Sequence, residues 1–254
     1  MTDFKNSKYP KWILWLCAIV VVTAFIWVIL ASMPEKPPAE PEIPPTTTES
    51  DAETQATQET TVPATEEIPL PWNLILVNPW NRIHEDFTVE LTQWEEDQLV
   101  DERIYHDLER MMADMGGSGL KPLVCSAYRT DEKQQTLYRN KVSQYLEKGY
   151  SLAEADAAAG KWVAVPGTSE HQTGLALDII DINYPYLNEK QENTAVQKWL
   201  MAHSWEYGFI LRYPGEKSEI TGINYEPWHY RYVGTEAAKE IFEQGICLEE
   251  YLEK

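Results

Sequence analysis

The amino-acid sequence predicts an α+β fold in which a small antiparallel sheet is flanked by helices. Segments with apolar residues at helical spacing dominate the first half of the folded region, whereas short apolar runs typical of strands gather in the second half. Helices followed by strands are typical of α+β domains rather than of alternating βαβ units. The length of 254 residues fits one such domain plus additional segments.

Each expected element has a local reason. Residues 74–79 form a short apolar run that ends in a proline, which indicates a strand closed by a turn. Residues 97–115 place apolar side chains at helical spacing and stop at Gly116 and Gly117, which predicts a helix. The later segments repeat these two patterns. Further helices are expected at 131–147, 151–159, 194–207 and 237–244, and further strands at 123–127, 174–182, 209–213 and 228–233.

The N-terminal segment predicts a membrane anchor. Residues 12–31 are uncharged and apolar, and a helix of that length rises about 30 Å, the thickness of a bilayer core. Lysines precede this run and acidic residues follow it, so the positive-inside rule places residues 1–11 in the cytoplasm and the remainder outside. A cleaved signal peptide is the alternative; we favour the anchor because the apolar run exceeds a typical signal core and lacks a good cleavage site.

Residues 32–71 predict a disordered linker between the anchor and the folded domain at 72–254. This stretch is dense in Pro, Glu and Thr and almost free of large apolar side chains, so it buries too little surface to offset its chain entropy. It carries nine acidic residues and one lysine between positions 34 and 67. We interpret it as a spacer that holds the domain away from the membrane.

The overall charge excludes one large class of partner. The formal net charge is -20 at pH 7. Nucleic-acid binding depends on Lys and Arg that neutralise phosphates, so no nucleic-acid partner is expected. The same charge argues against broad contact with anionic lipid, and nothing in the sequence indicates an oligomeric state.

The cysteines do not indicate a disulfide framework or a cysteine metal site. Cys17 lies in the expected anchor, which leaves Cys125 and Cys247 in the folded region. These two could pair, but buried free thiols are the favoured interpretation, and no CxxC motif is present. Cys125 has no paired base in the sequence, so we do not expect it to act as a nucleophile.

Two histidines stand beside carboxylate-bearing residues in a pattern that fits a zinc site. His171 precedes Asp178 by seven residues, and His229 follows Glu226 by three. Two imidazoles and a carboxylate supply three ligands and leave one position open, and a nearby glutamate can act as the base of a hydrolase. The spacing alone fits a buried ion pair equally well. Pro227 argues against a helical HExxH arrangement.

Three motifs resemble the VanY-like D-alanyl-D-alanine carboxypeptidases. The segment 126–134 matches SxYRSxxxQ apart from Thr130, the segment 169–178 matches SxHxxGxAxD in full, and the segment 226–229 matches ExWH. The likeness extends over roughly residues 74–252 in the family's order and spacing. It implies the small α+β fold shared by these peptidases and Hedgehog signalling domains.

The resemblance implies a role for each matched residue. The reaction would be zinc-dependent removal of the C-terminal D-alanine from a peptidoglycan stem peptide, in a D,D-carboxypeptidase. Glu226 would be the general base and then the general acid, and Arg129 would contact either the terminal carboxylate or the developing oxyanion. The expected Zn²⁺ ligands are His171, Asp178 and His229, and the expected substrate-binding residues are Ser126, Gln134, Ser169 and Trp228.

Several alternatives stay open at this point. An L,D-carboxypeptidase that acts on tetrapeptide stems shares these motifs. An endopeptidase is less favoured if Arg129 holds a free carboxylate. A non-catalytic wall-binding module is a third hypothesis.

With the anchor, the chain is expected in the plasma membrane of a Gram-positive-type bacterium, with its catalytic domain outside. The histidines that match no motif are expected at the surface or in structural positions: His84, His106 and His203.

Overall fold

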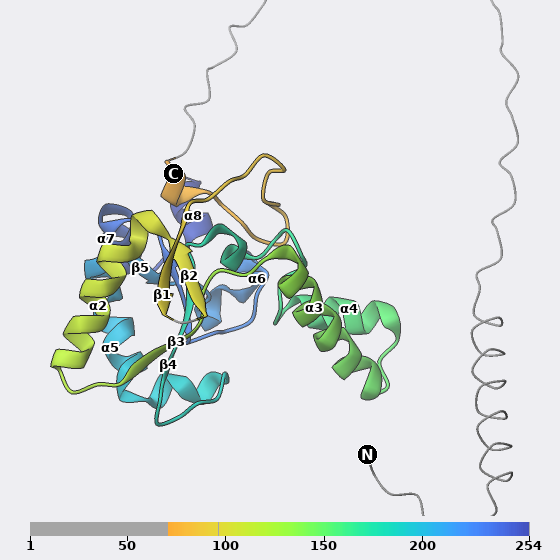
Figure 1. The fold of residues 1–254 in the computed structure, drawn as a ribbon. Coiled ribbons are helices and arrows are strands. Elements are labelled where there is room, and N and C mark those ends of the chain that lie inside the picture. Colours follow the sequence, from red (N-terminus) through yellow and green to blue (C-terminus); the bar gives the residue numbers. More distant parts are fainter. Residues whose placement is uncertain (1–70, 96, 254) are drawn as a thin grey trace, which may run out of the picture. The chain divides into compact units, whose positions relative to one another are not determined.

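The computed structural model describes residues 71–95 and 97–253, and it confirms an α+β fold. Its centre is a four-stranded antiparallel sheet with the strand order β3-β4-β6-β5 (Figure 1). The strands are β3 (Pro122–Ser126), β4 (Ala176–Asp181), β5 (Phe209–Leu211) and β6 (His229–Tyr232). A second, two-stranded sheet pairs β1 (Leu91–Glu95) with β2 (Gln98–Asp101).

Helices surround this sheet. In Figure 1, α3 and α4 lie together on one side of the domain, and α2, α5 and α7 lie on the other. The α-helices are α2 (Tyr105–Gly117), α3 (Asp131–Glu147), α4 (Leu152–Gly160), α5 (Ala195–His203), α6 (Ser218–Thr221), α7 (Thr235–Gln244) and α8 (Leu248–Leu252). Short 3₁₀ helices are η1 (Trp72–Leu74), η2 (Glu102–Ile104), η3 (Glu170–Thr173), η4 (Glu189–Asn193), η5 (Ser204–Tyr207) and η6 (Gly215–Lys217).

Side-chain alternation divides β4 and β6 between a core face and a site face. Leu177 and Ile179 of β4, together with Tyr230 of β6, belong to the main hydrophobic core. This core also holds apolar residues of α2 and α5, so these helices cover the same face of the sheet. Because successive side chains of a strand point to opposite faces, Asp178 and His229 share the other face. The central strands therefore present their polar residues together.

Two sequence predictions at the start of the domain were wrong. Residues 74–79 form no strand, and η1 ends at Leu74. The turn expected at their end is present, because the Asn78 side chain accepts hydrogen bonds from the backbone of Trp80 and Asn81. The helix expected from residue 97 begins only after Asp101, because the residues before it pair with β1 as strand β2. The Asp101 side chain accepts from Arg103 N and caps the following η2 turn.

The other predicted elements are present with small shifts in their bounds. Helix α3 begins and ends where predicted, because Thr130 caps its first turn by accepting from Lys133 N. The helix expected at 194–207 divides at Ser204 into α5 and η5. The strands expected at 209–213 and 228–233 are shorter, as β5 and β6.

The predicted anchor at 12–31, the cytoplasmic segment at 1–11 and the linker up to residue 70 lie outside the described residues. Within residues 71–95 and 97–253, no helix combines the length and apolar character needed to cross a membrane.

Candidate metal centre and active site

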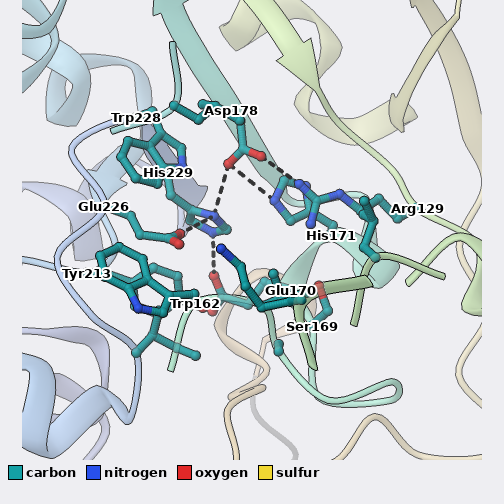
Figure 2. A pocket seen from close by; sticks show the side chains of 16 residues that line it. Arg129, Trp162, Ser169, Glu170, His171, Asp178, Tyr213, Glu226, Trp228 and His229 are labelled. Carbon is teal, nitrogen blue, oxygen red and sulfur yellow. Dashed lines mark hydrogen bonds and ion pairs between the residues drawn. The ribbon is translucent and has the colours of Figure 1, made fainter. Parts of the chain in front are cut away.

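Neighbouring strands bring two of the three expected metal ligands together. Asp178 on β4 and His229 on β6 are direct cross-strand partners. His171 lies on η3, just before β4, and Gly174 ends that turn with a left-handed φ of 75°. A positive φ is accessible to glycine at low cost, so the chain can reverse from η3 into β4 and place His171 over the strand. Figure 2 shows the three side chains converging on one point.

The geometry of the three residues fits a metal ion. Their ligand atoms all lie within 4.8 Å of one another. Asp178 Oδ1 is 3.3 Å from His171 Nε2 and 3.2 Å from His229 Nδ1. This carboxylate oxygen is buried and has no hydrogen-bond partner in the described part of the chain. Buried polar atoms are nearly always paired, so an orphaned carboxylate oxygen facing two imidazole nitrogens is suited to a cation.

Hydrogen bonds on the far side of each imidazole determine which ring nitrogen faces the expected metal position. His171 Nδ1 lies 2.8 Å from the carbonyl oxygen of Ala127, and His229 Nε2 lies 3.4 Å from Glu170 Oε2. Carbonyl and carboxylate oxygens only accept, so these nitrogens carry the protons. His171 Nε2 and His229 Nδ1 are therefore the nitrogens that face Asp178 and would supply lone pairs to a metal.

Glu226 lies beside the ligand cluster in the segment that leads into β6. Its Oε2 is 3.7 Å from His229 Nδ1, and its backbone N–H donates to the carbonyl of Tyr213. Burial raises the pKa of Glu226 to about 8, against the opposing influence of His229. A carboxyl group whose pKa lies near neutrality can both take up and release a proton, as a general base and acid must.

Neighbouring charges and burial together set the pKa values of the ligand side chains. Burial opposes ionisation of Asp178, but His171 and Arg129 outweigh it and hold the pKa of this carboxyl well below its usual range. Burial and the Arg129 charge lower the pKa of His171 to about 4. Burial also disfavours a charge on His229, yet the facing carboxylates of Asp178 and Glu170 raise its pKa to about 9. The Asp178 carboxylate thus stays ionised beside the two imidazoles.

Arg129 reaches the centre from the loop after β3 and donates to three side chains. Its Nη2 lies 2.6 Å from Asp178 Oδ2, its Nε lies 2.9 Å from Ser126 Oγ, and its Nη1 lies 3.5 Å from Gln134 Oε1. Ser126 and Gln134 were expected to line the substrate site, but neither lines the cavity. Gln134 is fully buried and also donates to the Ala164 carbonyl. Both residues contact the guanidinium and hold it in place, and their expected role in substrate binding stays a prediction.

A cavity of about 220 Å³ opens beside the ligands. The expected substrate residues Ser169 and Trp228 line it, together with Arg129 and Glu226. Sequence reasoning missed several other lining residues that come from distant segments: Leu137, Lys141, Trp162, Leu187, Tyr213 and Ile223. None of these residues lies in the three matched motifs at 126–134, 169–178 and 226–229.

The remaining titratable candidates lie away from this centre or are inert. His84, His106 and His203 are exposed, as expected. Cys125 and Cys247 are free thiols, and burial raises their pKa to about 12 and about 11, which disfavours the reactive thiolate.

The buried ion pair that the spacing left open is part of a larger arrangement. Asp178 contacts both histidines and Arg129, and Glu226 lies beside them. Two imidazoles, a carboxylate and an adjacent glutamate of raised pKa, placed at the wall of a cavity, define the site of a metal-dependent hydrolase.

Comparison with known proteins agrees with this class. Residues 97–235 match the family model described as VanY: D-alanyl-D-alanine carboxypeptidase. The chain belongs to this family. It is 50% identical over 181 residues to a D-alanyl-D-alanine carboxypeptidase of Enterococcus faecalis, a match that covers 71% of this chain and 66% of the relative. The chain thus spans slightly less than two thirds of that relative's length.

Solved structures of similar proteins share the fold. The vancomycin resistance D,D-pentapeptidase VanY from the VanB-type cassette, in complex with Zn(II), is 49% identical with a TM-score of 0.66. VanYB in complex with D-alanine-D-alanine is 48% identical with a TM-score of 0.67, and both matches cover 72% of this chain and 99% of the other. The LD-carboxypeptidase LdcB is 35% identical with a TM-score of 0.61, over 72% of this chain and 87% of its own.

Proposed function

We propose that this chain is a zinc-dependent D,D-carboxypeptidase that removes the C-terminal D-alanine from peptidoglycan stem peptides. The observation that carries the proposal is the convergence of His171, Asp178 and His229 beside Glu226 at the wall of one cavity. The similar VanY proteins, one bound to Zn(II) and one to D-alanine-D-alanine, support the metal and the substrate class.

Zinc fits the donor set of this centre. Two imidazole nitrogens and one carboxylate oxygen are a common ligand set of catalytic zinc sites, which keep a further position open. His171 Nε2, His229 Nδ1 and Asp178 Oδ1 would hold the ion. When bound, zinc supplies a Lewis acid that polarises the peptide carbonyl and lowers the pKa of water.

Glu226 moves the proton in the proposed reaction. Its carboxylate accepts a proton from the attacking water, and the carboxyl group then donates that proton to the leaving amine of D-alanine. The buried position of Glu226 keeps its pKa near neutrality, so both transfers are accessible. Its distance of 3.7 Å from His229 Nδ1 places it beside the ligands without making it one of them.

Two cations give the cavity an affinity for a free carboxylate. Arg129 and Lys141 both line it. Arg129 has five N–H donors, and three of them are directed at Asp178, Ser126 and Gln134, which leaves two for a substrate oxygen. Lys141 has no ion pair among the described residues, and its Nζ lies 5.8 Å from the centre of the Trp162 ring. A substrate with a charged C-terminus, as in an exopeptidase, would be stabilised here.

The decisive experiment measures released D-alanine from matched peptides. The purified protein is incubated with a stem pentapeptide, the corresponding tetrapeptide, and the pentapeptide blocked as a C-terminal amide, each with and without chelator. We expect D-alanine only from the free pentapeptide, and only without chelator. Cleavage of the amide would support an endopeptidase instead. Zinc binding without cleavage of any peptide would favour a non-catalytic wall-binding module.

An L,D-carboxypeptidase is the second candidate, because the similar LdcB is an LD-carboxypeptidase. Both activities release a terminal D-alanine that carries a free carboxylate, so the two cations serve either one. The residue before the scissile bond separates them, since it is a D-residue in the pentapeptide and an L-centre in the tetrapeptide. Preferential release from the tetrapeptide would replace the D,D assignment.

The proposed location is the outer side of the plasma membrane of a Gram-positive-type bacterium, with one N-terminal anchor. The uncharged residues 12–31, the lysines before them and the acidic linker after them support this topology. Protease added to intact cells without walls should degrade the domain and spare a tag at the N-terminus. Protection of the domain would rule out this orientation.

A further inference from the structure

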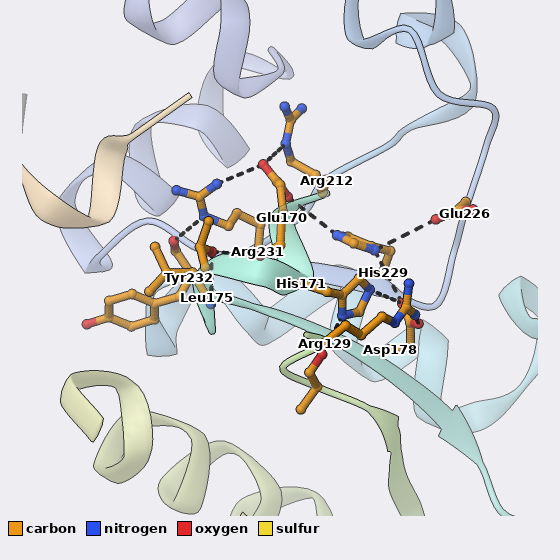
Figure 3. Close-up of polar contacts among 12 residues, drawn as sticks. Arg129, Glu170, His171, Leu175, Asp178, Arg212, Glu226, His229, Arg231 and Tyr232 are labelled. Carbon is orange, nitrogen blue, oxygen red and sulfur yellow. Dashed lines mark hydrogen bonds and ion pairs between the residues drawn. The ribbon is translucent and has the colours of Figure 1, made fainter. Parts of the chain in front are cut away.

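Glu170 is a buried carboxylate that the proposed mechanism does not use. It occupies the position before the ligand His171 on η3, and its side chain is fully buried. Its Oε1 accepts from Arg212 Nε and from Arg231 Nη1, each at 2.7 Å. Its other oxygen, Oε2, faces His229 Nε2 at 3.4 Å. Figure 3 shows Glu170 between the two arginines on one side and His229 on the other.

The two arginines hold this carboxylate in a set orientation. Both are fully buried and come from the segments around β5 and β6. Arg212 also donates two hydrogen bonds to Glu249, and Arg231 donates to the backbone carbonyls of Asn73 and Ile75. The four charged side chains balance, with two acidic and two basic groups. Paired and hydrogen-bonded on both sides, Glu170 has little freedom to turn away from His229.

We propose that Glu170 is a positioning residue of the metal centre, which holds His229 with its Nδ1 directed at the metal and strengthens that nitrogen as a ligand. A carboxylate that accepts from the far N–H of a ligating imidazole sets the ring orientation and increases the basicity of the other nitrogen. His171 has a neutral partner, the Ala127 carbonyl. The two ligating histidines are thus supported by acceptors of different charge. This inference rests on the proposed zinc site.

Glu249 provides a matched control. It also pairs with Arg212 and is mostly buried, but its remaining partner is Asn78 rather than a ligating histidine. Glu170→Gln and Glu249→Gln each remove one negative charge from the same cluster. Only Glu170→Gln replaces the acceptor that faces His229 by a neutral amide.

The test measures zinc affinity by competition with a chelator, together with the visible absorption of the cobalt-substituted protein. We expect Glu170→Gln to bind zinc roughly 10- to 100-fold more weakly than the wild type and to shift the cobalt bands. Glu249→Gln should match the wild type in both. Equal zinc affinity and equal cobalt spectra in the two variants would overturn the positioning role. Absence of zinc binding by the wild type would instead remove the proposed function.

Two double variants, each a pair of substitutions that leaves the net charge unchanged, cover the case in which a single variant does not fold. Glu170→Gln combined with Arg231→Met removes one charge of each sign, and Glu249→Gln combined with Arg231→Met does the same. Thermal unfolding of the metal-free proteins identifies general damage to the cluster. Zinc affinity should fall further in the pair that lacks Glu170 than in the pair that keeps it, and an equal fall in both pairs would contradict the proposal.

Discussion

Asp178 and His229 lie directly opposite each other on β4 and β6, with Asp178 Oδ1 3.2 Å from His229 Nδ1. Their backbones are held by the hydrogen bonds of the central ladder, and both side chains are buried. His171 is held separately by its hydrogen bond to the Ala127 carbonyl. The ligand set is therefore organised by the sheet before any metal binds.

Removal of the metal should leave the fold intact and lower its stability. Chelation should leave the far-ultraviolet circular dichroism unchanged, because the core and the ladder do not depend on the metal. The melting temperature should fall and recover with added zinc, since free zinc at a thousand times its Kd contributes about 4 kcal/mol. Loss of the helical signal on chelation would show that the ligands are not organised in advance.

Glu226→Gln should retain zinc and lose turnover. The amide keeps the size of the side chain but cannot accept a proton, so kcat should fall by roughly 10²- to 10⁴-fold. Metal analysis and released D-alanine check the two parts. Glu219→Gln, which changes an exposed carboxylate on α6, should behave as the wild type. Near-normal turnover in Glu226→Gln would remove the proton-transfer role from this residue.

Arg129→Lys should lower kcat/KM while zinc stays bound. Lysine keeps the charge but cannot contact Asp178, Ser126 and Gln134 together as the guanidinium does. Loss of one hydrogen bond to a charged group costs about 1.5–3 kcal/mol, or roughly a 10- to 100-fold effect. Arg139→Lys, at an exposed position of α3, is the control. An unchanged kcat/KM would mean that a positive charge at this position is sufficient for activity, without the three contacts of the guanidinium.

Lys141→Met should raise KM and leave kcat nearly unchanged. The half-buried Lys141 lines the cavity but belongs neither to the ligand set nor to the proton-transferring group, so it should act on substrate binding. We expect an increase of about two- to fivefold that becomes smaller at high salt. Lys133→Met, an exposed change on the same helix, should have no effect. A lower kcat at constant KM would place Lys141 in the chemical step.

Gly174→Ala should destabilise the protein more than Gly149→Ala. Both glycines have positive φ, 75° and 91°, so each alanine carries a backbone cost of about 1–2 kcal/mol. At Gly174 the added Cβ would also lie 2.9 Å from the Asp101 backbone nitrogen, whereas Gly149 faces open space. Overpacking adds about 1–3 kcal/mol at Gly174 alone. Chemical denaturation compares the two, and equal losses would show that the η3 turn can shift.

Local sequence patterns were sufficient to predict an element when its conformation depends only on its own residues. Helix α3 was predicted to the residue, because its N-cap Thr130 and its side-chain spacing are local features. Strand β2 was wrongly assigned to a helix, because its conformation depends on pairing with β1. Of the strand and turn expected at 74–79 only the turn is present, and the Asn78 side chain bonds both to its own loop and to Glu249 near the C-terminus.

By itself, the sequence determined the fold class, the family likeness and the candidate ligands His171, Asp178 and His229, because those motifs are short and contiguous. Only the tertiary structure decided that Ser126 and Gln134 hold Arg129, that Lys141 faces the cavity, and that Glu170 supports His229. Glu170 and His229 are 59 positions apart. A contact between such residues follows from how strands and turns pack, which no local pattern of side chains encodes.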